Sequence, residues 1–422
     1  MDALSSLQAD HDRLKTDIET TASFGAIEAE SGRGRTVLAG TPANKSARDY
    51  FVSRLDDAGL DVTIDAIGNI TGRWCPDSTD PDADPIAAGS HLDSVPEGGI
   101  FDGPLGVYAA LEAVRTLQDA EIEPARPIDV VSFTEEEGQR FSDGLLGSSV
   151  AVGDRSVEGA LALTDHEGTT LREALTEIGY DGTGLIDPAG WDGWFELHVE
   201  QDTVLETADV PVGVVTTITG IAHCHVSIAG EANHAGATPM GDRTDALAAA
   251  AEVVLAVESA ANQLVADESE SAVGTVGSLS VSPNATNVVP GEVSLGVDIR
   301  DVRYASIESL VETTKETLDQ IERERGVETA IERPFDLQPR PMSDRLRTFA
   351  HDAAEALEIG AIDLHSGAAH DTMYIADVTD AALLFAPSRD GISHNPREYT
   401  DWADCTAAAS VLAGAIGRAA TE

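Results

Sequence analysis

The fold of this chain is decided by two similar stretches, PIAAGSHLD at residues 85–93 and PIDVVSFTEEEG at residues 127–138. Each opens with a short apolar run, which is typical of a strand buried on both faces, and each then delivers polar residues into a loop. A helical pattern at about 105–119 separates them. Because strands that alternate with helices indicate an α/β layer, we predict an α/β fold with a mainly parallel sheet. Ligands of such sheets bind beyond the carboxyl ends of the strands, where both polar loops begin.

The pattern changes near residue 210 and changes back near residue 333. Between these points, strand-like and helical segments together favour a small α+β sandwich. The strand-like segments are 212–217, 222–229, 274–281 and 292–299, and the helical ones are 244–261 and 305–325. We therefore predict a catalytic domain in two parts, 1–209 and 333–422, with a second domain inserted at 210–332.

The composition is strongly acidic. The 422 residues include 75 Asp and Glu against 26 Lys and Arg, which gives a formal net charge of −49, while 42% of the residues are hydrophobic. This hydrophobic content excludes a disordered acidic chain, and the lack of basic surface excludes a general electrostatic nucleic-acid binder. The alternative of a moderately acidic mesophilic protein fits less well, because soluble domains usually carry a small net charge. An acid-rich, lysine-poor surface around an ordinary core indicates a halophilic protein, whose like charges are screened at high salt.

The sequence also indicates a compartment. Cys75, Cys224 and Cys405 are widely spaced and odd in number, so we expect a reducing cytoplasm rather than a disulfide framework. Residues 1–12 are polar and acidic, which is unlike a signal peptide. The longest apolar stretch, at about 246–257, is shorter than the ~20 residues that span a bilayer. We expect a cytoplasmic protein with no membrane partner.

Potential metal ligands follow both buried strands. His91 follows the first strand, in the loop, and Asp93 lies two residues later, placed to hold the second imidazole nitrogen and so to set the tautomer. Asp102 follows in the same loop. After the second strand, Glu136 and Glu137 offer adjacent carboxylates, of which one can ligate a metal while the other transfers protons.

The same residues also allow an interpretation without a metal, as an ordinary loop histidine and a solvated acidic run. In a chain this acidic, consecutive glutamates are weak evidence by themselves. Their position at the end of a buried strand, together with the His-x-Asp cluster, favours a metal site.

A third segment, residues 194–201, alternates between apolar and polar side chains. Its polar face carries Glu196, His198 and Glu200. Alone, His198 is more typical of a hydrogen-bonded sheet histidine. With the two clusters upstream it becomes a candidate ligand, and Glu200 on the same face is its competitor.

Seven motifs, in order, resemble the hydantoinase/carbamoylase family of di-metal amidohydrolases. They are His91-x-Asp93-Ser94, Asp102-Gly103, Glu136-Glu137-Gly138-x-Arg140-Phe141, His198-x-Glu200-Gln201, His234-Ala235-Gly236-x-Thr238-Pro239-Met240, Ser366-Gly367-x-x-His370-Asp371 and Ile392-Ser393-His394-Asn395. The resemblance runs from about residue 30 to the end of the chain. It implies a catalytic domain like that of di-zinc exopeptidases, with an inserted lid and dimerisation domain through which a homodimer forms.

The resemblance also implies two divalent metal ions. The ligand sets that it implies are His91, Asp102 and His198 for one ion, and Asp102, Glu137 and His394 for the other. Nitrogen and oxygen ligands around a bridging carboxylate suit Zn²⁺, with Mn²⁺ or Co²⁺ as alternatives. Glu136 would be the general base, which takes a proton from the attacking water and returns it to the departing nitrogen.

Further positions match substrate-binding motifs of the family, namely Gln201, His234, Asn287, Arg300 and His370. The resemblance implies that His234 polarises the substrate carbonyl, while Asn287 and Arg300 clamp a carboxylate. A planar guanidinium suits this task better than lysine does, although Arg300 alone is equally typical of a surface ion pair. Ala369 and Thr372 stand where the family usually has smaller residues, which leaves the substrate size open.

The implied reaction is cleavage of a linear ureido or carbamoyl C–N bond, with N-carbamoyl-L-amino acids yielding the amino acid, CO₂ and ammonia. The alternatives are an allantoate amidohydrolase, an aminoacylase or exopeptidase, and a non-enzymatic descendant that only binds small molecules. The exopeptidases and aminoacylases generally place a carboxylate where this chain has His198. A descendant that only binds would have lost a ligand or the base, and this sequence retains them all.

Overall fold

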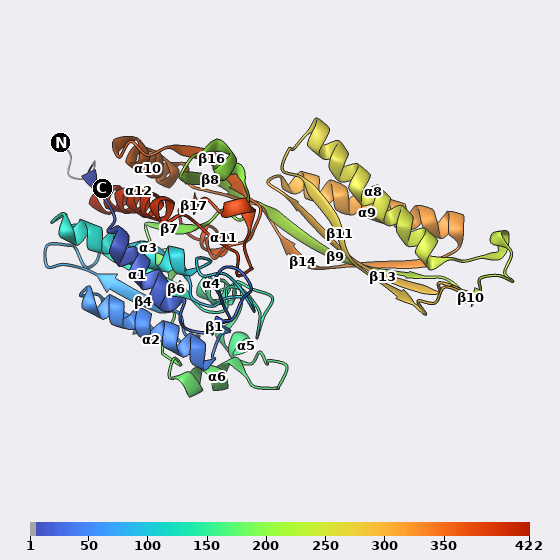
Figure 1. The fold of residues 1–422 in the computed structure, drawn as a ribbon, viewed down its shortest axis with the longest axis horizontal. Coiled ribbons are helices and arrows are strands. Elements are labelled where there is room, and N and C mark those ends of the chain that lie inside the picture. The colour runs from blue at the N-terminus through green and yellow to red at the C-terminus, as the bar shows by residue number, and fades with distance from the viewer. Residues whose placement is uncertain (1–5) are drawn as a thin grey trace. The chain divides into compact units, whose positions relative to one another are not determined.

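The computed structural model describes residues 6–422, which fall into two compact units (Figure 1). The discontinuous unit contains the chain up to Thr216 together with Pro341–Glu422, and the inserted unit is Thr217–Arg340. The insertion therefore begins and ends several residues later than the predicted 210–332. The reason lies in strand pairing: β8 (Val212–Ile218) joins the large sheet, whereas β14 (Glu328–Leu337) joins the small one.

A nine-stranded sheet forms the centre of the discontinuous unit. Its order is β15-β8-β17-β7-β5-β6-β4-β3, with β16 paired to β8. The remaining strands are β3 (Asp61–Ile64), β4 (Ile70–Trp74), β5 (Ile86–His91), β6 (Ile128–Phe133), β7 (Gly193–Val199), β15 (Arg340–Pro341), β16 (Ala361–Ser366) and β17 (Ala381–Ala386), and β1 (Ala26–Ile27) and β2 (Gly34–Arg35) form a separate pair. The four central strands β17, β7, β5 and β6 are parallel. The prediction of an α/β fold with a mainly parallel sheet is confirmed.

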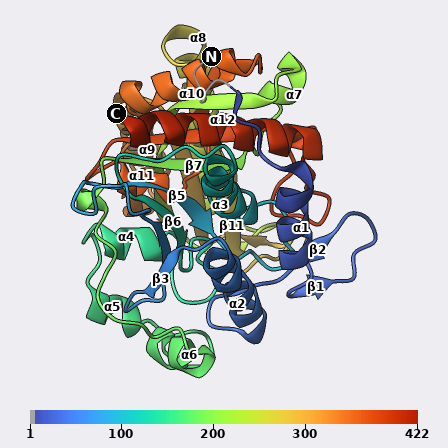
Figure 2. The same ribbon diagram turned by 90° about the vertical axis from the view of Figure 1, so that its left-hand side faces the viewer.

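Helices cover both faces of this sheet (Figure 2). One face packs against α3 (Pro104–Asp119), α10 (Asp344–Ala356) and α12 (Trp402–Thr421), and α1 (His11–Thr21) packs on α3 and α12. A smaller apolar cluster on the other face includes Phe133, Trp194 and Ile375. The remaining helices are α2 (Pro42–Asp57), α4 (Leu146–Ala151), α5 (Val157–Leu161), α6 (Leu171–Ile178), α7 (Val204–Ala208) and α11 (Thr372–Ile375). Because both faces are covered, β5, β6 and β7 are buried along their whole length, which explains their apolar runs.

The inserted unit is a four-stranded antiparallel sheet with two helices on one face. The strand order is β11-β13-β9-β14, with β9 at Gly220–Ala229, β11 at Val273–Ser282 and β13 at Glu292–Asp301. The helices are α8 (Ala246–Asp267) and α9 (Tyr304–Arg325), and a short ribbon pairs β10 (Asn233–His234) with β12 (Val288–Val289). Side chains of β13 alternate between buried and partly exposed, so one face of the sheet packs on the helices.

Helix α8 is longer than the apolar stretch seen in the sequence. It runs for 22 residues, and it is the one helix within residues 6–422 that is long and apolar enough to cross a membrane by length and composition. Its buried residues, among them Val253 and Val257, pack against the small sheet. A core helix can meet the same criterion, so this helix is weak evidence for a membrane span.

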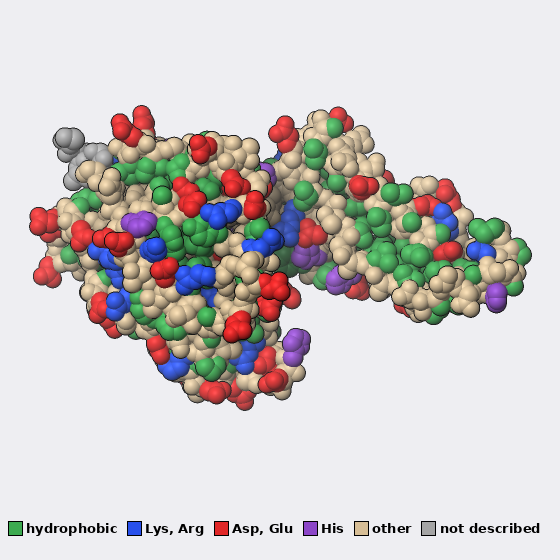
Figure 3. Space-filling view, viewed as in Figure 1, with side chains coloured by type: hydrophobic (Ala, Val, Ile, Leu, Met, Phe, Trp, Pro, Cys, Tyr) green, Lys and Arg blue, Asp and Glu red, His purple; other side chains and the backbone are tan. Residues whose placement is uncertain are grey.

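Acidic side chains are spread over the visible surface of both units, with fewer basic ones between them (Figure 3). This distribution agrees with the formal net charge of −49. Such a surface repels itself at low ionic strength.

Candidate metal centre

The predicted ligands of the discontinuous unit meet at the carboxyl edge of its parallel strands. His91 ends β5 and His198 is the penultimate residue of β7. Glu137 follows β6, and Asp102 directly precedes the turn into α3. His394 lies in the loop after β17. This is the position that the order of strands and loops predicts for the functional site.

The described residues contain two groups of potential metal ligands, and the groups share Asp102. Within each group, the ligand atoms all lie within 4.8 Å of one another. In the first, Oδ1 of Asp102 lies 3.4 Å from Nε2 of His91 and 3.2 Å from Nε2 of His198. In the second, Nε2 of His394 lies 3.5 Å from Oδ2 of Asp102 and 3.3 Å from Oε2 of Glu137. The two groups contain the same residues as the two predicted ligand sets. Each oxygen of Asp102 faces a different group, as a bridging carboxylate requires.

Both buried histidines turn the same ring nitrogen towards the centre. Nδ1 of His91 lies 3.2 Å from the carbonyl oxygen of Asp93, and Nδ1 of His198 lies 3.0 Å from that of Val199. Each Nδ1 can therefore donate to a backbone carbonyl, which leaves Nε2 with a lone pair facing the centre. Nε2 of His91 is buried without a hydrogen-bond partner in the described chain. Such an orphaned acceptor, with nitrogen and oxygen donors around it, fits a divalent metal ion.

Asp93 acts differently from the prediction. Its carboxylate lies 3.7 Å from Nδ1 of His91, so the backbone carbonyl rather than the side chain sets the tautomer. The carboxylate instead accepts from the N–H groups of Glu136 at 3.3 Å and Glu137 at 3.1 Å. The left-handed backbone of Glu135, with φ at 57°, begins the turn that presents these N–H groups. Asp93 therefore positions the glutamate pair.

Glu136 lies at the centre but belongs to neither ligand group. Its Oε2 is 3.6 Å from Nε2 of His91. Burial raises the pKa of Glu136 well above its ordinary value, and the charges of Asp371 and Glu137 act in the same direction. Burial also raises the pKa of Glu137 to about 8. Glu136 is thus a buried titratable carboxylate beside the two ligand groups and outside both, and its predicted role as general base stays a prediction.

Two histidines favour the ionised form of Asp102 despite its burial. Burial opposes its ionisation, but His198 and His91 hold its pKa well below the ordinary value. The next residue, Gly103, has φ at 79°, and a Cβ there would lie 2.6 Å from the ring of His91. Glycine is needed at this position because both the backbone conformation and the close approach exclude a side chain.

Gln201 and His370 also lie at this centre. Nε2 of Gln201 donates to Oδ2 of Asp102 at 3.1 Å. The ring of His370 is buried 4.6 Å from that of His198, and burial together with the charge of His198 lowers the pKa of His370 well below its ordinary value. Their predicted contacts with substrate stay predictions. Glu200, the competitor of His198, instead accepts from backbone N–H groups at the start of α7.

The other predicted substrate residues belong to the inserted unit. His234 and Asn287 lie together, since the N–H of Ala235 donates to the carbonyl of Asn287 at 3.0 Å. Nδ1 of His234 accepts from two backbone N–H groups, at 3.0 and 3.1 Å, so its proton is on Nε2. Arg300 lies on β13, where Nε and Nη2 donate to Asp298 at 2.9 and 3.0 Å.

Three further buried charged residues lie at the centre, and only Asp371 stands in one of the seven motifs, without an assigned role. Arg35 donates from Nη2 to the carbonyls of Asp93 and Asp102, at 3.3 and 3.4 Å. Asp371 and Glu398 are almost fully buried as well. Each contacts segments that are far away in the sequence, and no local pattern reveals such contacts.

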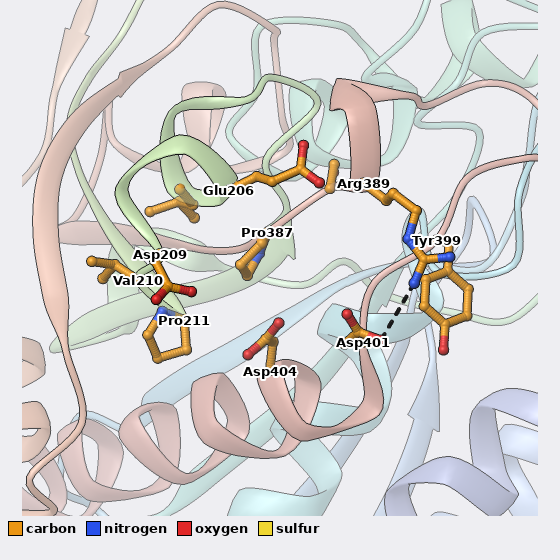
Figure 4. A pocket seen from close by; sticks show the side chains of 11 residues that line it. Glu206, Asp209, Val210, Pro211, Pro387, Arg389, Tyr399, Asp401 and Asp404 are labelled. Atoms are coloured by element: carbon orange, nitrogen blue, oxygen red, sulfur yellow. Dashed lines mark hydrogen bonds and ion pairs between the residues drawn. The ribbon is translucent and has the colours of Figure 1, made fainter.

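A separate acidic pocket of about 260 Å³ lies elsewhere on the discontinuous unit (Figure 4). Its lining includes Asp209, Asp401 and Asp404, with Arg389 paired to Asp401 at 3.5 Å and stacked 4.0 Å from the ring centroid of Tyr399. No histidine lines this pocket. It contains none of the predicted site residues.

Known proteins resemble this chain along its whole length. Residues 87–418 match the family model described as peptidase family M20/M25/M40. The chain is 39% identical over 393 residues to an N-carbamoyl-L-amino acid amidohydrolase of Geobacillus stearothermophilus, which covers 92% of this chain and 94% of that protein. It is 34% identical over 419 residues to a ureidoglycolate hydrolase of Arabidopsis thaliana, covering 97% and 86% respectively. The crystal structure of a hydantoinase/carbamoylase family amidase from Burkholderia multivorans matches with a TM-score of 0.91 and 36% identity, over 99% of both chains.

Proposed function

This chain belongs to the peptidase M20/M25/M40 family and, within it, to the hydantoinase/carbamoylase amidases, and on that premise we propose that it hydrolyses N-carbamoyl-L-amino acids to the amino acid, CO₂ and ammonia. That it is a hydrolase of non-peptide C–N bonds follows from its relatives. The proposal rests on the position of Asp102, whose two oxygens face two separate ligand groups. Glu136 lies beside these groups and belongs to neither.

The proposed cofactors are two divalent metal ions, with Zn²⁺ first and Mn²⁺ or Co²⁺ as alternatives. His91, Asp102 and His198 would hold one, and Asp102, Glu137 and His394 the other. When bound, such a pair supplies Lewis-acid activation of water and of the scissile carbonyl.

The chain's own residues perform the proton transfers. Glu136 accepts a proton from the attacking water as the new C–O bond forms. It then delivers this proton to the nitrogen as the C–N bond breaks, so that the amine side leaves neutral. Asp93 fixes the backbone of Glu136 by accepting its N–H at 3.3 Å, which keeps the carboxylate aimed at the centre.

Residues of the inserted unit bind the substrate in this proposal. Nε2–H of His234 donates to the developing oxyanion, because its Nδ1 is already held by two backbone N–H groups. Arg300 binds the substrate carboxylate. Asn287 and His234 lie near the start of β13 at Glu292, about 26 Å along the strand from Arg300, so they would reach the same substrate from the second subunit of the proposed homodimer. Asp298 accepts from Nε and Nη2 of Arg300 and so orients the planar guanidinium.

We also propose that the protein is a cytoplasmic homodimer formed through the inserted unit. Strand β11 is an edge strand of the small sheet, and its Val273 and Leu279 are 47% and 46% exposed. Leu255 on the neighbouring α8 is 62% exposed. An apolar edge strand is a surface for pairing with a second copy. Light scattering after size-exclusion chromatography in molar KCl tests this, with a dimer mass expected.

A second candidate function is hydrolysis of allantoate or ureidoglycolate. Relatives named ureidoglycolate hydrolase and allantoate deiminase, at 34% identity, support it. Ammonia release should be compared among N-carbamoyl-L-amino acids, allantoate and ureidoglycolate, and release of the free amino acid should be measured for N-acyl amino acids, with metal and high salt present. We expect the highest kcat/KM for an N-carbamoyl-L-amino acid. Release from allantoate or ureidoglycolate alone would favour the second candidate, and cleavage of N-acyl amino acids alone would reject both.

A further inference from the structure

Glu398 connects the two loops that carry Asp102 and His394. Its side chain is almost fully buried, with the residue 3% exposed. Oε1 accepts from the N–H groups of Phe101 at 2.9 Å and Asp102 at 3.1 Å. Oε2 lies 2.8 Å from the hydroxyl of Ser393, whose single proton is shared between this oxygen and Oδ2 of Asp102. Both carboxylate oxygens are therefore engaged, one by each loop.

The same arrangement holds the side chain of Asp102. The hydroxyl of Ser393 lies 2.8 Å from Oδ2 of Asp102, the oxygen that faces His394. Ser393 is also the residue directly before His394. The backbone N–H of Glu398 donates to the carbonyl of Asn395 at 2.9 Å and closes the turn after His394. Glu398 thus fixes both the bridging carboxylate and the loop of the exposed histidine.

The chain leaves space for this carboxylate. A Cβ on Gly99 would lie 2.2 Å from Oε1 of Glu398 and 2.3 Å from its Cδ. Gly99 does not adopt a left-handed conformation, so the close approach of Glu398 explains the glycine. The buried guanidinium of Arg35, which donates to the carbonyl of Asp102, supplies positive charge nearby.

The two ligand groups depend on Glu398 to different degrees. His91 and His198 are oriented by backbone carbonyls next to them in the chain, at 3.2 and 3.0 Å. His394 has a side chain that is 53% exposed and a left-handed backbone with φ at 53°. Its loop is held to the centre through Ser393 and Glu398. Removing Glu398 should therefore disturb the ligand positions of the second group more than those of the first.

We propose that Glu398 is a positioning residue that builds the second ligand group, made of Asp102, Glu137 and His394, and so fixes the number of metal ions bound. It acts through Ser393 and the backbone of Asp102. This inference rests on the proposed two-metal function. Removing partners of metal ligands typically weakens metal affinity by about 10- to 100-fold.

The test is the metal stoichiometry and stepwise affinity of the full-length protein, measured by elemental analysis and titration with Zn²⁺ in molar KCl. Wild type should bind two ions. Glu398→Ala should keep the first and bind the second about 10-fold more weakly or worse, with activity recovering in excess Zn²⁺. Glu398→Gln should bind two, because its amide oxygen still accepts from both N–H groups while its amide nitrogen donates to Ser393. Gly99→Ala should weaken the second ion, since its Cβ displaces the carboxylate.

Asp65→Ala is the matched control. Asp65 is also a buried carboxylate that holds a turn, before β4, by accepting from three backbone N–H groups, those of Ile67 at 3.0 Å, Asn69 at 2.9 Å and Ile186 at 3.4 Å. It should bind two ions. If Glu398→Ala bound two ions as tightly as wild type, or if Glu398→Gln or Asp65→Ala lost the second ion equally, the positioning role would be overturned. A wild type that bound fewer than two ions would instead refute the proposed two-metal centre itself.

Discussion

The candidate metal centre and the acidic pocket of Figure 4 are both rich in carboxylates, yet they are built differently. At the centre, carboxylates are buried beside histidines, and Nε2 of His91 is left without a hydrogen-bond partner in the described chain. In the pocket, Asp401 pairs with Arg389, and no histidine is present. The comparison teaches that acidic residues alone do not make a site in this chain. The centre differs from the pocket because it also contains histidine nitrogens and buried side chains that hydrogen bonds hold in place.

The same contrast extends to the electrostatics of the whole molecule. Burial raises the pKa of Glu137 at the centre to about 8. On the surface, the guanidinium of Arg333 donates to Glu308 and lowers the pKa of that carboxyl. Burial thus disfavours the ionised form of a carboxylate at the centre, and a bound cation would favour it. Surface carboxylates are solvated in their ionised form, and their mutual repulsion comes from the summed charge of the molecule.

The largest effect is expected from Glu136→Gln. The amide keeps the shape of the side chain but cannot take a proton, so kcat should fall by about 100-fold or more. Metal content should stay at the wild-type value. Glu137→Gln is the matched variant and should lose metal, because Oε2 of Glu137 faces His394 at 3.3 Å. The roles would be reversed if Glu136→Gln lost its metal and Glu137→Gln kept it.

A smaller effect is expected from Arg300→Lys, which keeps the charge but removes the planar fork. KM for a carboxylate substrate should rise by roughly 10-fold, the scale of a lost charged hydrogen bond, and clearly more than kcat falls. Arg303→Lys, which replaces an exposed partner of Glu268 in the same unit, is the control. An unchanged KM for Arg300→Lys would remove this residue from substrate binding.

The raised pKa values predict how pH affects the metal-free protein. Burial raises the pKa of both Glu137 and Asp371 to about 8. The native state therefore binds protons more tightly than the unfolded state, so the stabilisation is complete below the unfolded values near 4 and is lost as pH rises through about 8. With chelator in molar KCl, Tm should fall between about pH 5 and pH 8, and saturating Zn²⁺ should reduce this fall. A metal-free Tm that rises over this range would contradict the assignment.

The smallest effect per residue comes from the surface. The formal net charge of −49 means that the surface carboxylates repel one another. Tm and activity should both rise between about 0.1 M and 2 M KCl, because the Debye length shrinks from about 10 Å towards 3 Å or less. A salt with a different anion at equal ionic strength separates screening from a specific ion effect. Equal stability and activity at about 0.1 M salt would reject the halophile hypothesis and leave the centre untouched.

Local features of this fold could be predicted from the sequence, and long-range ones could not. The buried strands β5 and β6 and the ligands that follow them are visible in short apolar runs and motifs. The start of the insertion was predicted at 210 because residues 212–217 are typical of a strand in either sheet. Their pairing with β15, β16 and β17 is what assigns this strand to the large sheet. Asp93 was placed near His91, but which of its atoms contacts the ring depends on a turn after β6.

Glu398 shows the limit most clearly. It accepts from the N–H of Asp102, which lies 296 residues earlier in the chain. Nothing in the sequence around it distinguishes it from the many other glutamates of this acidic protein. Only folding brings it to the centre, where its burial gives it a role.

The most direct test of the central claim is anomalous diffraction from a crystal grown with Zn²⁺ and measured at the zinc absorption edge. Two strong peaks are expected, about 3.5–4 Å apart. One should lie among His91, Asp102 and His198, and the other among Asp102, Glu137 and His394. A single peak, or zinc bound in the acidic pocket beside Asp401 and not at Asp102, would contradict the account.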